Sequence, residues 1–290
     1  MKKLISTLIA LSVAGSFSAT VAADQFYIDI GLDAGGNANA AEGDVTHTGW
    51  LDQLSFLYNS TSTITDSGGG AANALSVGDT ILSKGGILND NFIDPTDISI
   101  NLIDGFEPAE NTFGGPSDNG FGYGSNKWGL TFGFDDLMGT WNGAGFTYTS
   151  GTISMYYYDN TMVNSAGFIR LFDLNVMSGG DTGNATVLNG MLTNFGALSS
   201  VNLVDAGDVF NFAAGSFGDL SGPPNNQMIS FNASQDTQSL NNLSFTNGVA
   251  TTAGSHNGSI NFSTVPEPAS LAILSLGLLG FAGAKRRKAK

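Results

Sequence analysis

The chain has 290 residues, 41% of them hydrophobic and 12% charged, with no cysteine and a formal net charge of −15 at pH 7. High hydrophobicity with few charges excludes an intrinsically disordered chain, and the lack of cysteine excludes disulfides and thiolate metal sites. Three basic residues, Lys84, Lys127 and Arg170, stand against 25 acidic ones between Asp24 and Glu267, so this region carries about −22. Nucleic acid is excluded as a partner, because phosphate contacts need a basic surface.

The first predicted element is an export signal at residues 1–23. Lys2 and Lys3 precede a long apolar run, and small residues follow up to Ala23. This order of charge, apolar run and small residues is typical of a secretory signal peptide. We predict cleavage after Ala23, so that the exported chain starts at Asp24.

Residues 24–264 predict a single acidic, all-β ectodomain. Alternation of apolar residues indicates strands with one buried face, as in Phe26, Ile28, Ile30 and Leu32. Further strand-like runs, separated by glycine-rich turns, lie at 51–64, 98–103, 128–134, 145–159, 168–177, 208–215, 227–233 and 258–265. Many short strands with such turns favour a β-sandwich or jelly-roll-like fold.

Two oxygen-rich loops are candidates for calcium binding. Calcium takes six to eight oxygen ligands from flexible loops, and each loop contains several such residues. The first offers Asp33, Asn37, Asn39, Glu42 and Asp44, and the second offers Asp90, Asp94 and Asp97. Neither loop has the EF-hand spacing, since Gly35 and Ala38 occupy positions that the EF-hand reserves for a ligand and for glycine. The alternative is that these residues form turns and hydrate the surface.

A β-hairpin is predicted in the tyrosine-rich segment 145–159. Strand-like residues flank Ser150-Gly151 on both sides, which indicates a short turn. After this turn Ile153, Met155 and Tyr157 share one face, and the other face carries Ser154, Tyr156 and Tyr158.

One segment, 185–201, has helical rather than strand-like spacing. Its apolar residues recur at intervals of three and four, at Val187, Met191, Leu192, Phe195 and Leu198. This spacing predicts a short helix.

No catalytic constellation emerges, so we expect a non-enzymatic protein. A Ser-His-Asp triad would need His47 or His256, the only two histidines. His256 lies in the polar stretch "TAGSHNGS", which predicts a solvated loop residue. Asp135 and Asp136 are the candidate pair for a glycosidase, but adjacent strand residues point to opposite faces of a sheet.

The last 26 residues, 265–290, consist of three parts. Pro266-Glu267-Pro268 comes first, and the run of 16 uncharged residues from Ala269 to Ala284 follows. A helix of that length spans about 24 Å at ~1.5 Å per residue, slightly less than a ~30 Å hydrocarbon core. The third part is a basic cluster of Lys285, Arg286, Arg287, Lys288 and Lys290. We predict one transmembrane helix, with the basic end cytoplasmic by the positive-inside rule and the body outside.

These three parts, in this order, resemble the PEP-CTERM sorting signal of exopolysaccharide-producing Gram-negative bacteria. The same tail is also described as an ice-binding protein C-terminal domain, a label that does not imply ice binding. The resemblance covers Val265 to Lys290. It implies recognition by exosortase, a membrane transpeptidase thought to cleave near the motif. It also implies a transient anchor in the inner membrane, followed by release to the cell surface or the extracellular medium.

The body is similar only in composition and architecture to flocculation-associated PEP-CTERM proteins, through its glycine-, asparagine- and aromatic-rich β character. We therefore expect a surface or extracellular-matrix protein that aids flocculation or biofilm cohesion, with exopolysaccharide or other matrix components as partners. The alternative is a carbohydrate-binding or carbohydrate-active protein of the same matrix. Its candidate sugar-stacking aromatics are Trp141, Tyr156, Tyr157 and Tyr158.

Overall fold

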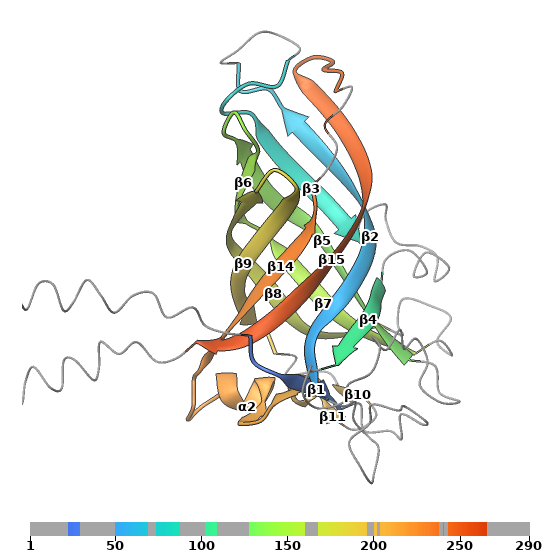
Figure 1. Ribbon diagram of the computed structural model, residues 1–290, viewed down its shortest axis with the longest axis vertical. Coiled ribbons are helices and arrows are strands. Elements are labelled where there is room, and N and C mark those ends of the chain that lie inside the picture. Colours follow the sequence, from blue (N-terminus) through green and yellow to red (C-terminus); the bar gives the residue numbers. More distant parts are fainter. Residues whose placement is uncertain are drawn as a thin grey trace, which may run out of the picture.

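The computed structural model describes residues 23–29, 50–68, 74–87, 102–108, 128–159, 168–195, 200–201, 204–237, 240 and 243–265. For 102–108, 128–129, 158–159 and 200–201 it describes the backbone only. Within these ranges the chain is almost entirely β-structure (Figure 1). The all-β prediction is therefore confirmed.

The strands in chain order are β1 (Phe26–Ile28), β2 (Leu51–Thr65), β3 (Thr80–Gly86), β4 (Leu102–Pro108), β5 (Trp128–Trp141), β6 (Phe146–Ser150), β7 (Thr152–Asp159), β8 (Phe168–Asp181), β9 (Ala185–Thr193), β10 (Ser200–Val201), β11 (Val204–Asp205), β12 (Phe210–Phe212), β13 (Gly215–Ser216), β14 (Met228–Asp236) and β15 (Val249–Val265). A 3-10 turn, η3 (Ala206–Asp208), and a short α-helix, α2 (Phe217–Ser221), lie between β11 and β14.

The long strands form one antiparallel sheet that closes on itself, which we call the cylinder. Pairing runs from β2 through β15, β14, β9 and β8, continues through β6 and β7 to β5 and β3, and returns to β2. The closing ladder joins Ser60 with Gly85 at one end and Thr65 with Thr80 at the other. The predicted β-sandwich is wrong on this point, because a sandwich consists of two packed sheets and here a single sheet encloses the core.

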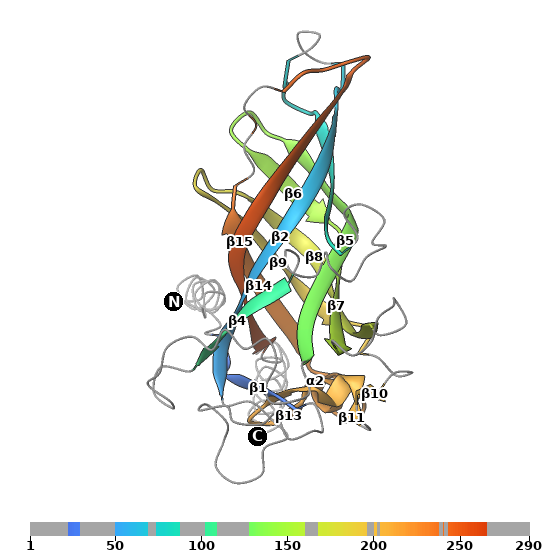
Figure 2. The same ribbon diagram turned by 90° about the vertical axis from the view of Figure 1, so that its right-hand side faces the viewer.

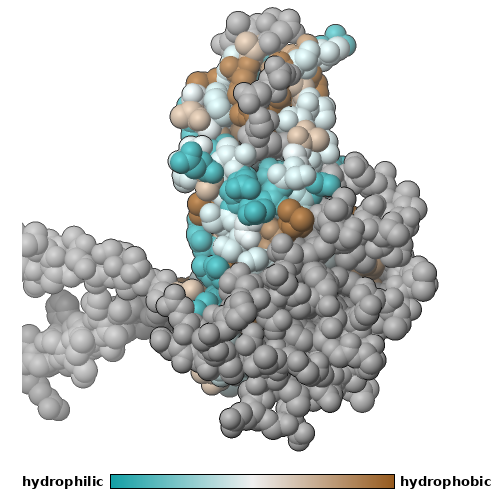
Figure 3. Space-filling model, turned by 45° about the vertical axis from the view of Figure 1, so that its right-hand side comes forward, coloured by the Kyte–Doolittle hydropathy of each residue, from teal (hydrophilic) through white to brown (hydrophobic). Residues whose placement is uncertain are grey.

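Apolar residues at every second position determine which face of each strand points into the cylinder. In β2, for example, Leu54, Phe56 and Tyr58 are buried while the residues between them are half-buried. Such alternation places one face of each strand in the core and the other in solvent. The coloured part of the face shown in Figure 3 is accordingly mostly hydrophilic or neutral, with hydrophobic residues gathered mainly towards its upper end. Two exposed residues of this kind, Leu82 and Met138, are direct partners across β3 and β5.

The lower end of the cylinder is filled by phenylalanine side chains. The segment 204–221 lies across this end together with β1 (Figures 1 and 2), and β1 pairs with both β12 and β2. The rings at this end come from five different elements and are at most 1% exposed, namely Phe26, Phe172, Phe210, Phe217 and Phe262. Their centroids lie 5.1–6.5 Å apart where they touch. This aromatic cluster closes the core at the lower end.

The predicted hairpin at 145–159 is wrong, although one of its two predicted faces is buried as expected. Both β6 and β7 lie between β5 and β8 and pair with both of them, so the two form one interrupted strand. The interruption is at Gly151, whose φ is 151° and where a Cβ would lie 2.8 Å from the Cα of Leu137. Ile153, Met155 and Tyr157 are all buried, as predicted.

The predicted helix at 185–201 is also wrong, since residues 185–193 form strand β9. Thr186, Leu188, Gly190 and Leu192 are buried in strict alternation. The strand pairs along its length with β8 and β14, so backbone hydrogen bonds on both sides fix the extended form. Val187 and Met191 gave the helical spacing, but they lie half-buried on the outer face.

Candidate functional site

Most residues of the predicted sites lie outside the described residues. These are the eight calcium candidates (Asp33, Asn37, Asn39, Glu42, Asp44, Asp90, Asp94 and Asp97), the motif Pro266-Glu267-Pro268 and the basic cluster from Lys285 to Lys290. The predicted signal peptide up to residue 22 and the predicted transmembrane run lie outside them as well. In the ranges that the structure does describe, no three His, Asp or Glu side chains are grouped to hold a metal ion. None of the helices in those ranges has the length and apolar character to cross a bilayer.

The residues that follow the predicted signal peptide and precede the predicted sorting tail lie side by side. The backbone N–H of Asp24 donates to the carbonyl of Phe262 at 2.9 Å. The Asp24 carboxylate in turn accepts hydrogen bonds from Thr264 N at 2.6 Å and Thr264 Oγ1 at 2.7 Å. Asp24 is the predicted first residue of the exported chain, and Thr264 is next to the end of β15. Residues 240 positions apart are thus held together at the lower end of the cylinder.

A buried serine–histidine pair lies inside the cylinder. His256 of β15 stacks on Tyr58 of β2 with ring centroids 4.9 Å apart. Its Nδ1 lies 3.0 Å from the carbonyl oxygen of Asp236, and its Nε2 lies 2.7 Å from Ser60 Oγ. Because a carbonyl only accepts, we assign the proton to Nδ1, and the neutral ring then accepts the Ser60 hydroxyl at Nε2.

The prediction that His256 is a solvated loop residue is therefore wrong. Its side chain is 4% exposed, and "TAGSHNGS" is the middle of β15, where His256 is the direct partner of Tyr58. Small polar residues are typical of loops, but here they pair with β2 over a long ladder. The adjoining cavity has a volume of about 10 Å³, which is room for one water at most. Ser60 and His256 have the residue types of a hydrolytic dyad, but the cavity leaves no space for a substrate.

Burial lowers the pKa of His256 below its ordinary value, against a smaller opposing effect of the Asp236 carbonyl. The unfolded chain therefore takes up a proton below about pH 6.5 that the folded chain does not. We expect the free energy of unfolding to fall as the pH drops from about 6.5 towards the folded pKa, by at most about 1.4 kcal/mol per pH unit. The contribution of neutral His256 is fully present above pH 6.5. Urea titrations of the wild type and His256→Gln at pH 7.5 and 5.5 measure it, and equal pH dependence in both would show that folding does not shift the pKa of His256.

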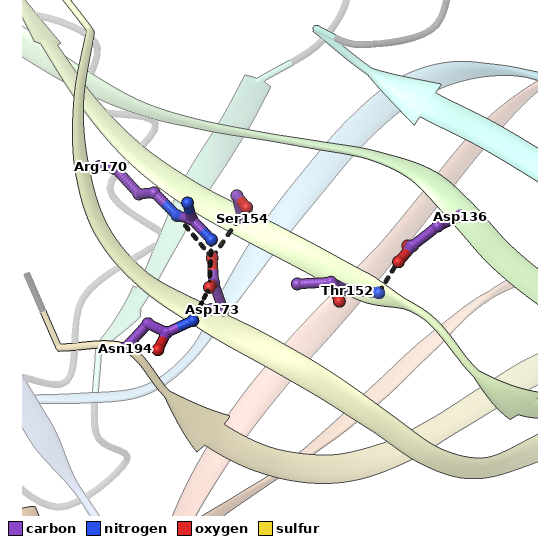
Figure 4. Close-up of polar contacts among 6 residues, drawn as sticks. All are labelled: Asp136, Thr152, Ser154, Arg170, Asp173 and Asn194. Carbon is purple, nitrogen blue, oxygen red and sulfur yellow. Dashed lines mark hydrogen bonds and ion pairs between the residues drawn. The ribbon is translucent and has the colours of Figure 1, made fainter.

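A buried carboxylate with four hydrogen bonds lies on the outer face of β8 (Figure 4). Asp173 is 0% exposed. Its Oδ1 accepts from Arg170 Nε at 2.7 Å and from Ser154 Oγ at 2.8 Å. Its Oδ2 accepts from Asn194 Nδ2 at 2.7 Å and from a terminal nitrogen of Arg170. The hydrogen bond and charge of Asp173 raise the pKa of Arg170, one of the three basic residues between the ends of the chain.

The four hydrogen bonds make Asp173 a structural residue, and this is testable. We expect Asp173→Ala to lower the free energy of unfolding by about 2–3 kcal/mol, because hydrogen bonds to a charged group contribute about 1.5–3 kcal/mol. Ser154 and Asn194 would lose their acceptor, whereas the half-exposed Arg170 returns to water. Asp136→Ala is the matched control, since that exposed carboxylate accepts a single hydrogen bond from the described residues, from Thr152 N at 2.7 Å. Equal losses for both variants in urea unfolding would contradict the assignment.

A regular strand would point Asp135 and Asp136 to opposite faces of the sheet, as we predicted. In the structure this pair does not do so. Both residues are exposed. Along the β3–β5 ladder Gly85 pairs with Phe134, and Ser83 already pairs with Leu137. Three steps on β5 therefore match two on β3, and this β-bulge places both carboxylates outside.

The four aromatic residues considered for sugar stacking do not form one platform. Tyr157 is 2% exposed and belongs to the core, while its neighbour Tyr156 is half-buried on the other face. Trp141 is half-buried and packs edge-on against Phe146, with centroids 5.1 Å apart. The side chain of Tyr158 is outside the described residues.

The chain carries a PEP-CTERM protein-sorting motif, whose family model matches residues 264–288. This confirms the resemblance drawn from the three-part tail. The motif implies a surface or extracellular protein that is exported, transiently anchored in the membrane and processed by exosortase. Neither the curated proteins nor the solved structures contain a significant match to the chain. The motif begins at Thr264, the residue whose backbone and side chain Asp24 binds.

Proposed function

We propose that the protein aids flocculation or biofilm cohesion as a non-enzymatic component of the cell surface or extracellular matrix. The observation that carries the proposal is the sorting motif at 264–288. Its start lies next to Asp24, where the predicted signal peptide ends. Because Asp24 and Thr264 lie at the lower end, the membrane-bound precursor would direct that end to the bilayer. The rest of the cylinder then extends outwards, where matrix components can reach it.

The negative charge of the body determines whether copies of the protein can cohere directly or need a partner between them. Between Asp24 and Glu267 the net charge is about −22, and like charges repel within a Debye length of about 10 Å at 0.1 M salt. Direct contact between copies is therefore unfavourable. Cohesion through an exopolysaccharide, or through divalent cations such as calcium at the two predicted loops, avoids this repulsion.

Deletion of the gene tests the proposal. The deletion strain should flocculate less or form a weaker biofilm, while dispersed cells grow normally. The full chain should restore cohesion, and a chain without residues 265–290 should not, because it lacks the sorting motif. A deletion strain that aggregates normally but fails to grow on one polysaccharide would reject the proposal in favour of a carbohydrate-active protein.

A further inference from the structure

A groove with a volume of about 510 Å³ lies on the outer face of the sheet across β8, β9, β14 and β15. Three asparagines of successive strands line it, Asn189 of β9, Asn232 of β14 and Asn261 of β15, and we call them the asparagine row. Asn232 is the direct cross-strand partner of both Asn189 and Asn261. Ser178 of β8 is the partner of Asn189 and extends the row by one strand.

The alternation of the strands turns the asparagine row outwards. Phe231, Ile260 and Phe262, which adjoin Asn232 and Asn261 in sequence, are buried in the core. The asparagines themselves are half-buried. Neighbouring strands lie about 4.8 Å apart, so the two outer asparagines are separated by roughly 10 Å. A ligand that contacts the whole row is therefore longer than one sugar ring.

The row keeps hydrogen-bonding capacity for a ligand. Asn232 Nδ2 donates to Asn189 Oδ1 at 2.7 Å. This bond holds both amides in place and leaves the Asn232 carbonyl oxygen and the Asn189 amino group available. The Asn261 side chain makes no hydrogen bond to any other described residue. Each amide has both donor and acceptor groups, a combination that suits hydroxyl groups, which also donate and accept.

None of the described residues that line the groove is charged, in a region of the chain that carries about −22. An anionic ligand would find no Lys or Arg there, and a cation would find no carboxylate. Met177 and Met191 add apolar surface beside the amides, which suits the C–H faces of a sugar. We propose that this groove binds a neutral polysaccharide segment. The inference rests on the proposed matrix function and adds both the site and the class of ligand.

The test uses mature protein purified from the native host and the host's exopolysaccharide, separated into neutral and anionic fractions. We expect the neutral fraction to bind, and Asn232→Ala and Asn261→Ala each to weaken binding about fivefold, as expected for the loss of a hydrogen bond of about 1 kcal/mol. Asn257→Ala is the matched control, because Asn257 is an exposed asparagine of the same strand as Asn261 but does not line the groove. Circular dichroism establishes that each variant is folded, and Asn232→Asp retests the site with a side chain of the same shape.

The possible outcomes separate this inference from the proposed function. Weaker binding in the row variants, with Asn257→Ala unchanged, supports the groove as the site. Undiminished binding in all row variants overturns the groove while leaving a matrix role intact. Binding of the anionic fraction alone overturns the neutral ligand. If no fraction binds while gene deletion still weakens cohesion, the inference fails and the proposed function stands.

Discussion

Replacement of Phe217 by alanine is expected to lower the free energy of unfolding by about 3–5 kcal/mol, the usual range for a buried phenylalanine. Phe217 is 0% exposed. Its ring has neighbours on four strands, with centroid distances of 4.5–6.5 Å to Phe26, Phe172, Phe210, Phe212 and Phe262. It is also the first residue of α2, a helix of five residues. So short a helix is not stable without tertiary contacts. Loss of the ring should therefore detach α2 from the aromatic cluster at the lower end of the cylinder.

Urea unfolding of Phe217→Ala and Met228→Ala measures this effect. Met228 is an apolar residue at the start of β14 that is 50% exposed, so its truncation should change the free energy of unfolding by less than about 1 kcal/mol. Similar losses in the two variants would show that the aromatic cluster does not anchor α2.

Replacement of Glu267 by alanine is expected to abolish most of the release of the protein from the membrane. Since a proline disfavours the helical conformation of the residue before it, we expect from the sequence that Pro268 keeps Glu267 extended, with its carboxylate available to a processing enzyme. Loss of that charge removes the group that the motif places between its prolines. Fractionation of the native host should then show the precursor in the membrane fraction.

Asp135→Ala is the control for this experiment, because Asp135 is an exposed carboxylate on the cylinder. It should leave the distribution between membrane and medium unchanged. Normal release of Glu267→Ala would mean that the carboxylate is not read directly.

The strands were predictable because apolar residues alternate along most of them, but the closure of the sheet was not. Alternation such as Leu54, Phe56 and Tyr58 indicates a buried face whether the sheet is open or closed. What distinguishes the two is the pairing of β3 with both β2 and β5. β2 and β3 follow one another in the chain, but β4 stands between β3 and β5 in the sequence, and no local pattern records that β3 meets both β2 and β5.

Small residues account for two of the differences in local structure, namely the strand β3, which was not predicted, and the loop predicted around His256. Glycine normally indicates a turn, yet Gly85 lies inside the closing ladder. A Cβ at Gly85 would be 2.4 Å from Phe134 Cζ and 2.9 Å from Tyr58 Cε2. Glycine is thus required there to make room for aromatic rings of other strands. The stretch "TAGSHNGS" also has the small polar residues of a loop, yet it pairs with β2 and contains the buried His256.

The functional residues were harder to find than the strands. The sorting motif is contiguous, so the sequence was sufficient to identify it. Asn189, Asn232 and Asn261 lie on three strands, the first two 43 positions apart in the sequence, and become neighbours only through the register of the sheet. The available signal was weak: Asn232 and Asn261 each stand between apolar residues, at an outward position of a predicted strand.

The mass of the intact protein released by its native host is the most direct test of exosortase sorting. The expected mass is that of a chain that starts at Asp24 and ends close to Pro266–Pro268, without the apolar run and the basic cluster. A mass that includes Lys290 in most of the surface-exposed protein would contradict sorting by this route.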